Sequence, residues 1–129
     1  MSKQAIFTDK APAPVASYSH AVKANGMLFL AGQGGFDVRT GQLVGDGIEE
    51  QTRQTLQNLQ HVLEAGGASW DDVVSVRVYV TEHAEFAGMN QVYGEFFTEP
   101  YPARTTVFCQ LAPGMKVEID AVAVLGGGS

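Results

Sequence analysis

The chain has 129 residues, 45% of them hydrophobic and 17% charged, a composition typical of one globular domain with a sizeable core. Its 14 acidic and 8 basic residues give a net charge of −6, which argues against a nucleic acid or an anionic membrane surface as a partner. No apolar stretch approaches roughly 18 residues, so no transmembrane helix is expected.

The expected organisation is a single domain over residues 1–125, followed by a flexible glycine-rich tail or linker at 126–129. The one cysteine, Cys109, cannot form an intrachain disulfide, and no basic N-terminal segment followed by an apolar run is present. The cytosol is therefore the expected location.

The first half of the chain predicts a short strand around residues 5–8, a proline-rich loop over 11–16 and a hairpin. Asn25-Gly26 supplies the positive φ of a tight turn between strands at 20–23 and 27–33. A glycine-rich loop over 34–41 follows. Apolar residues recur at helical spacing between Gly47 and Ala65, and Gly66-Gly67 ends the helix.

The second half predicts a strand over residues 72–81, a helix over 83–97 and two strands over 103–110 and 115–124. In the first of these strands alternation places Val74, Val76, Val78 and Val80 on one face. The order β-β-β-α-β-α-β-β predicts an α+β fold in which two helices lie on one face of a mixed sheet.

The predicted hairpin strand Met27-Leu28-Phe29-Leu30-Ala31 is apolar on both faces. A sheet with one face in water alternates more cleanly, so the second face is expected to be covered by another copy of the chain. The alternative is a central strand that exposes one Leu or Phe side chain.

Arg104 begins the strand that follows Pro100 and Pro102. Each proline fixes its own φ and favours extended geometry in the residue before it, so the guanidinium is held in one direction. Its planar fork of donors matches a carboxylate, which suits the binding of a small acid. A surface or ion-paired arginine is the alternative.

Alternation places Arg104, Thr106 and Phe108 on one face of their strand, and Lys116, Glu118 and Asp120 on one face of the last strand. If both rows point away from the helices, Arg104 and Glu118 share a pocket beneath the sheet, with a cation for a substrate carboxylate and a carboxylate for proton transfer or water positioning. A cross-strand ion pair that serves only stability remains the alternative.

No metal site is expected. The three histidines lack metal-ligand spacing, one cysteine cannot supply a cluster, and no G-x-S-x-G nucleophile elbow is present. The isolated histidines are His20, His61 and His83.

A series of short segments runs in colinear order over nearly the whole chain. They are Tyr18-Ser19-His20-Ala21-Val22, Phe29-Leu30-Ala31-Gly32-Gln33, Glu49-Glu50-Gln51-Thr52, Asn58-Leu59, Asn90 with Tyr93, Phe96-Phe97, Pro102-Ala103-Arg104-Thr105-Thr106-Val107 and Val117-Glu118-Ile119-Asp120-Ala121. Together they resemble the RidA/YjgF reactive-intermediate deaminases, and the Pro-Ala-Arg segment is the most specific of them.

The resemblance implies a chorismate-mutase-like fold of the bacillus type that forms a homotrimer, with an inner barrel of sheets and active sites in the clefts between subunits. It implies hydrolysis of enamines and imines, such as 2-aminoacrylate or 2-iminopropanoate, to 2-keto acids and ammonia, without a cofactor or metal. By position, Arg104 would bind the substrate carboxylate, Glu118 would orient or activate water, and Tyr18 would line the site. The implied substrate-binding positions are Ala31, Gly32, Asn90 and Thr106.

Several positions depart from the common family pattern. Ala31 stands where many relatives have Ser, Thr106 where many have Cys, Gly34-Gly35 where Ile-Pro is frequent, and Ser17 where Pro usually precedes the tyrosine. These changes favour a branch with a shifted substrate range. The remaining alternatives are a non-catalytic ligand-binding or chaperone-like trimer and, disfavoured by the negative charge, a ribonuclease.

Overall fold

The structure, a computed structural model, describes residues 2–126. The last three residues of the expected tail lie outside that range. The helices and strands follow the predicted order, with short 3-10 turns before β4 and α2. Their bounds are β1 Gln4–Ile6, β2 Ala21–Ala24, β3 Met27–Gln33, α1 Ile48–Ala65, β4 Val73–Val80, α2 Phe86–Phe96, β5 Ala103–Phe108 and β6 Val117–Val124.

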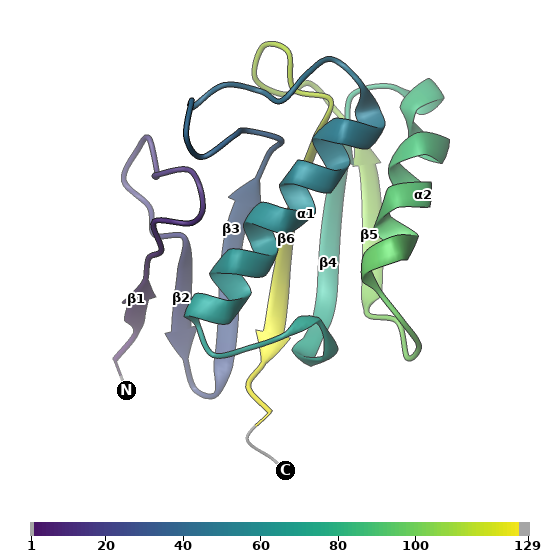
Figure 1. Ribbon diagram of the computed structural model, residues 1–129. Coiled ribbons are helices and arrows are strands. Elements are labelled where there is room, and N and C mark those ends of the chain that lie inside the picture. The colour runs from purple at the N-terminus through teal and green to yellow at the C-terminus, as the bar shows by residue number, and fades with distance from the viewer. Residues whose placement is uncertain (1, 127–129) are drawn as a thin grey trace.

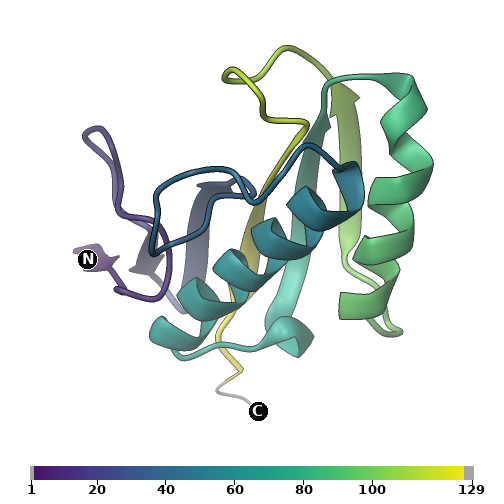
Figure 2. The same cartoon turned by 45° about the horizontal axis from the view of Figure 1, so that its top comes forward.

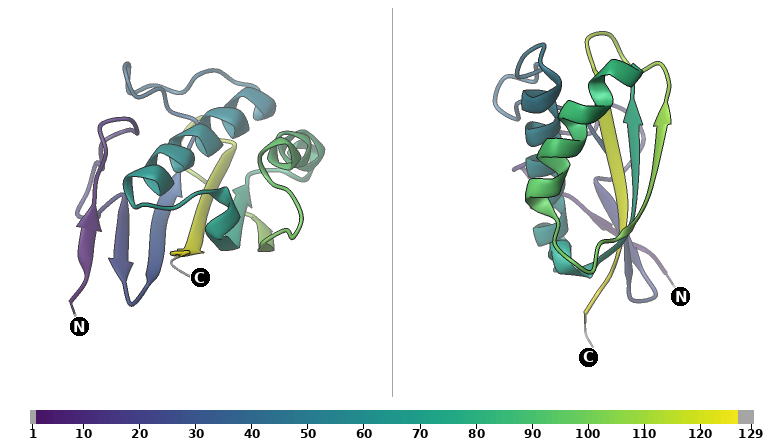
Figure 3. Two further views of the ribbon diagram at one scale, coloured as in Figure 1. Left: turned by 60° about the horizontal axis from the view of Figure 1, so that its bottom comes forward. Right: turned by 90° about the vertical axis from the view of Figure 1, so that its right-hand side faces the viewer.

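The strands form one sheet in the order β1-β2-β3-β6-β4-β5. The β4–β5 pair is parallel, and the other neighbours are antiparallel. Both helices lie on one face of this mixed sheet (Figure 1), and the edge-on view of Figure 3 shows the opposite face bare. The predicted α+β arrangement is confirmed.

The β2–β3 hairpin turns at Asn25 and Gly26, whose φ angles are +55° and +76°. Two successive positive φ angles match the twist of the flanking strands, and asparagine and glycine tolerate them best. The predicted hairpin is therefore confirmed, and its register places Phe29 opposite Val22.

The core lies between the helices and the sheet. From α1, Leu56, Leu59 and Leu63 are at most 1% exposed, and they face Val78 and Ile119 in the same buried cluster. Burial of large aliphatic side chains is the main favourable contribution to folding here.

Gln51 is one of the buried polar residues on the inner side of α1. Its Nε2 donates hydrogen bonds to the carbonyls of Gly45 at 2.8 Å and Gly114 at 3.0 Å, and its Oε1 accepts one from the Lys116 N–H at 2.8 Å. This one side chain therefore fixes two loops, 34–47 and 109–116, at the same end of the sheet (Figure 2).

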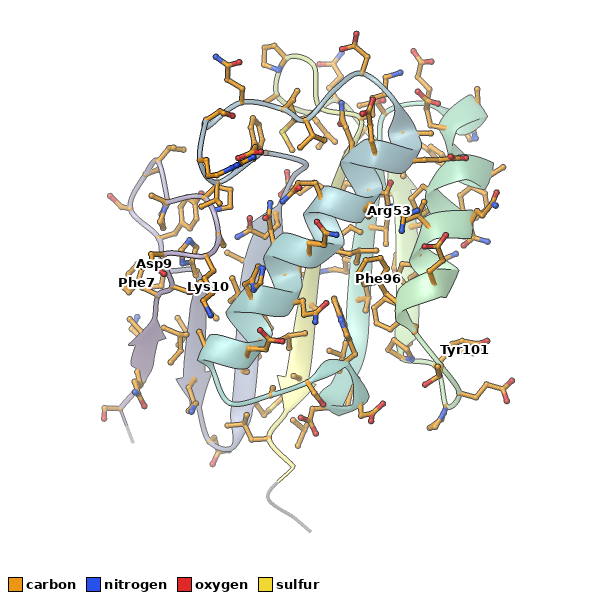
Figure 4. All side chains as sticks on the ribbon, in the orientation of Figure 1. Phe7, Asp9, Lys10, Arg53, Phe96 and Tyr101 are labelled. Atoms are coloured by element: carbon orange, nitrogen blue, oxygen red, sulfur yellow. The ribbon has the colours of Figure 1, made fainter. Side chains whose placement is uncertain are left out.

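Asn58, two helical turns further along α1, extends this anchoring. Its Nδ2 donates to the carbonyls of Gly34 and Phe36 at 3.1 and 3.0 Å. On the outer side, Arg53 pairs with Glu95 of α2, with 2.5 Å between Nη1 and Oε1; Figure 4 shows Arg53 between the two helices. The polar side chains of α1 thus position the surrounding segments, whereas its leucines form the core.

The sheet face opposite the helices is partly apolar and open in the single chain. Phe29 is 44% exposed, although its neighbours Leu28 and Leu30 are buried. Phe29 pairs with Val122 of β6, so the apolar strip crosses several strands. The expectation that both faces of β3 are apolar is confirmed, and what covers the outer face remains a prediction.

Val74 departs from the expected alternation. It is 46% exposed, while Val76, Val78 and Val80 are buried as predicted. A register shift between Val73 and Ser75 against β6 causes the difference, because a bulge moves one residue to the other face. Val73 is buried in its place.

Within residues 2–126, no helix is both long and apolar enough to cross a membrane.

Candidate active site

A cavity of about 770 Å³ lies between the proline-rich loop, the end of β3 and the loops anchored by Gln51 and Asn58. Four of the seven residues expected at the site line this cavity: Tyr18, Ala31, Gly32 and Glu118. These four residues are called the Glu118 half-site below.

Glu118 lies on β6 and is half-buried at the wall of the cavity. A Cβ added at Gly32 would collide with its carboxylate, so glycine at this position provides the space that the side chain occupies. Burial, with a smaller contribution from the negative charge of Asp120, raises the pKa of Glu118 above its ordinary value of 4.5. A raised pKa makes the carboxylate a stronger proton acceptor than an ordinary glutamate, which suits it to proton transfer.

Asp120 lies on the same strand and is fixed by two neighbours from β4. Arg77 Nε donates to Asp120 Oδ1 at 2.8 Å, and the Tyr79 hydroxyl donates to Oδ2 at 3.0 Å. Burial, followed by the contacts with Asp120, raises the pKa of Tyr79, so the phenol stays protonated as the donor. This network keeps a negative charge near Glu118, and the sequence analysis did not identify it.

Arg104 lies on β5, at the edge of the sheet. Its Nη1 donates to Asn90 Oδ1 of α2 at 2.8 Å, and its guanidinium carbon lies 4.7 Å from the centre of the Tyr93 ring. Burial raises the pKa of Tyr93, although Arg104 opposes the shift. The centre of the Phe86 ring lies 5.8 Å from the same guanidinium carbon. Because one amide and two aromatic rings restrain it, the guanidinium is held in a defined orientation. Thr106 lies two residues further along β5, on the same face as Arg104. Asn90, Arg104 and Thr106 are called the Arg104 half-site.

The expectation that Arg104 and Glu118 share a pocket beneath the sheet is wrong for a single chain. Strand β4 lies between β5 and β6, so the two residues are not on adjacent strands. In the strand register, Arg104 lies beside Val76, which is buried on the helix side of the sheet. Glu118 lies beside Tyr79, whose side chain points to the opposite side. The two half-sites therefore lie on opposite faces of the sheet.

His20 connects three segments around the Glu118 half-site and is 2% exposed. Its Nδ1 accepts the Thr8 N–H at 3.1 Å, so Nε2 carries the proton and donates to the Pro12 carbonyl at 2.6 Å. Its own carbonyl accepts the Ala31 N–H at 3.0 Å. The side chain thus holds the proline-rich loop that lines the cavity.

Replacing His20 with leucine is expected to lower the free energy of unfolding by about 1–3 kcal/mol, because two backbone groups lose their partners. His20→Gln is the matched control, since an amide keeps one donor and one acceptor. Denaturant titrations at one fixed protein concentration measure both variants. Equal stability of the leucine and wild-type proteins would show that the imidazole does not hold the loop.

Among residues 2–126, no group of three or more His, Cys, Asp or Glu side chains is placed to hold a metal ion.

Comparison with known proteins identifies the family. Residues 8–125 match the family model described as Endoribonuclease L-PSP. A RutC family protein of Pyrococcus horikoshii is 46% identical over 122 residues, which cover 94% of this chain and 97% of that protein. The mouse protein named 2-iminobutanoate/2-iminopropanoate deaminase is 37% identical, with 96% of this chain and 93% of that protein covered.

The fold matches as well. The crystal structure of RidA from the Antarctic bacterium Psychrobacter sp. superposes with a TM-score of 0.89 at 41% identity, covering 94% of this chain and 98% of that one. The sequence match and the structural match extend over nearly the whole chain, in agreement with the resemblance of the short segments. The chain belongs to the RidA/YjgF family.

Proposed function

We propose that this protein hydrolyses enamines and imines of amino acids to 2-keto acids and ammonia, at sites formed between copies of the chain. The observation that carries the proposal is Glu118, a half-buried carboxyl group with a raised pKa at the wall of the cavity, where Gly32 leaves room for its side chain. The name of the mouse relative, an imine deaminase, supports the same reaction.

We place the reaction between copies of the chain because the two half-sites are separated within one chain. The Glu118 half-site has a carboxyl group but no cation among its residues, and Arg104 lies on the other face of the sheet. A second copy that covers the open sheet face can bring its Arg104 half-site to the first copy's cavity. Closed ring symmetry repeats this contact, and the family resemblance favours three copies.

The proposed chemistry assigns one task to each group. The Arg104 guanidinium binds the substrate carboxylate, and Tyr18 lines the site. Glu118 positions a water molecule and takes its proton as the water oxygen bonds to the imine carbon. Glu118 passes this proton to the nitrogen, which gives a carbinolamine. The hydroxyl proton of the carbinolamine then moves to the nitrogen, the C–N bond breaks, and ammonia leaves as the C=O bond forms. Positioning and exclusion of bulk water account for most of the acceleration, and because the hydrolysis is redox-neutral it needs no electron donor or acceptor.

The direct test is ammonia release from 2-aminoacrylate, or from imines that an amino-acid oxidase generates in the assay. We expect 2-keto acid and ammonia to appear in equal amounts, faster than spontaneous hydrolysis and in proportion to the protein added. A rate equal to the protein-free rate for all substrates would contradict the proposal and favour a ligand-binding role.

The assembly is expected to be a homotrimer of about 41 kDa, three times the chain mass of 13.8 kDa. Light scattering measures this mass. Phe29→Asp places a charge on the open apolar face and is expected to dissociate the trimer and abolish deaminase activity. Gln57→Asp, on the exposed side of α1, is the control and should change neither. A wild-type monomer at micromolar concentration would contradict both the trimer and the shared site.

The family description also names an endoribonuclease. RNA binding depends on free cations, since phosphate attraction dominates the affinity. Of the eight Lys and Arg residues, at least four are already paired with carboxylates: Arg39, Arg53, Arg77 and Lys116. We therefore expect no RNA cleavage above background at physiological salt.

A further inference from the structure

The cavity beside Glu118 is far larger than a three-carbon substrate requires. Its volume is about 770 Å³, within the range of about 300–1,000 Å³ for small-molecule sites. A three-carbon imino acid has six heavy atoms. At about 30 Å³ each, the share of one water in the liquid, they need at most ~180 Å³. In the single chain, most of this volume remains for a larger substrate side chain and for the groups that a second copy brings to the site.

The lining of the cavity is polar at one end and apolar elsewhere. Tyr18, Gln33 and Glu118 are the polar residues of the lining, and Glu118 is the one charged residue among the described residues that line the cavity. The rest of the wall includes Phe36, Val38 and Met115. A substrate that places its imine carbon at Glu118 would therefore direct its side chain against an apolar wall.

Gly34 allows this wall to form. A Cβ added at Gly34 would lie 2.5 Å from Met115 Cε and 3.1 Å from Phe36 Cε2. Both side chains therefore pack directly against the glycine backbone. Methionine is flexible and polarisable, so Met115 can adapt to side chains of different shape.

From these observations we infer that the preferred substrates are imino acids with bulky apolar side chains, of the size of leucine, methionine or phenylalanine. The inference rests on the proposed deaminase function and adds to it the substrate class. Phe36, Val38 and Met115 are the specificity-determining residues. A charged side chain gains nothing from this wall, and an acidic one is in addition repelled by Glu118.

The expected preference is large enough to measure. Each methylene group that leaves water for an apolar wall is worth about four-fold in binding. The leucine-derived imine has three more carbons than the alanine-derived one. We therefore expect its kcat/KM to be higher by a factor on the order of 50.

The test compares imines generated in the assay from alanine, leucine, methionine, phenylalanine and glutamate. The expected order places the three bulky apolar imines well above the alanine-derived imine, and the glutamate-derived imine below the leucine-derived one. Equal kcat/KM values, or a preference for the alanine-derived imine, would overturn the inference and leave the deaminase function intact. That result is expected if a second copy fills the apolar end of the cavity.

One variant tests the wall itself. Val38→Trp fills the apolar end from an exposed loop position, so the ratio of leucine-derived to alanine-derived kcat/KM is expected to fall at least five-fold. Gln57→Trp, on the exposed side of α1, is the matched control and should leave the ratio unchanged. An unchanged ratio in Val38→Trp would show that the substrate side chain does not bind at this wall.

A binding measurement separates failure of this inference from failure of the proposed function. Calorimetry compares two 2-keto acids, pyruvate and 4-methyl-2-oxopentanoate, which are the products of the alanine-derived and leucine-derived imines. Tighter binding of the larger acid without any imine hydrolysis would support the ligand class and overturn the deaminase function. Equal binding of both acids would overturn the ligand class.

Discussion

Replacing Arg104 with alanine is expected to remove most of the deaminase activity and leave the fold and assembly intact. A charge-assisted contact with a substrate carboxylate is worth about 1.5–3 kcal/mol, which corresponds to roughly ten-fold to over a hundred-fold in kcat/KM. The fold should tolerate the change because Arg104 is only half-buried at the sheet edge and its hydrogen-bond partner, Asn90, is exposed. Kinetics, circular dichroism and light scattering on the same preparation measure the three properties.

Arg104→Lys is expected to restore little of that activity. The lysine ammonium is a point charge that cannot bind a carboxylate with two parallel hydrogen bonds. It also lacks the planar group that lies over the Tyr93 ring in the wild type. Arg53→Ala is the matched control, because Arg53 pairs with Glu95 on the outer side of the helices and contacts neither half-site. Wild-type turnover in Arg104→Ala would show that Arg104 has a structural role only.

Local elements of this fold could be predicted because short-range rules determine them. Asn25-Gly26 predicts a two-residue turn through the positive φ angles that it tolerates, and the structure contains that turn. The spacing of Leu56, Leu59 and Leu63 predicts α1, and all three side chains are buried. In each case a few neighbouring residues carry all the information that the prediction needs.

The placement of Arg104 and Glu118 on opposite faces of the sheet could not be predicted from such short-range rules. Strands β5 and β6 follow each other in sequence, and consecutive strands are often neighbours in a sheet. Here the loop over 109–116 crosses β4, which lies between them. Pairing between strands depends on contacts over the whole sheet, so alternation within each strand could show which residues share a face but not which face that is.

The structure also differs from the sequence prediction in its buried polar residues. Gln51 and Asn58 lie on the buried side of α1 because loop carbonyls need donors there. A helical pattern built only on apolar residues does not reveal such positions. Both residues act on the site indirectly, since they hold the loops that line the cavity.

Glu118→Gln is expected to lower kcat by about 100-fold or more and to leave substrate binding largely intact. Glutamine keeps the volume and one acceptor oxygen, but it cannot take a proton from water. The second possibility is that Glu118 only neutralises a partner's Arg104. The variant would then bind substrate equally well or more tightly, with kcat hardly changed. KM and kcat measured together on one imino acid distinguish these cases.

The pH profile gives an independent check of the same assignment. Burial raises the pKa of Glu118 above 4.5, so the carboxylate that accepts the proton forms only as the pH rises through that higher value. Wild-type kcat/KM is therefore expected to increase with pH along a limb that lies above pH 4.5. The limb should be absent in Glu118→Gln, because glutamine does not titrate. If the limb persists in the variant, a group other than Glu118 causes it. An unchanged kcat in Glu118→Gln would show that Glu118 does not take part in the reaction.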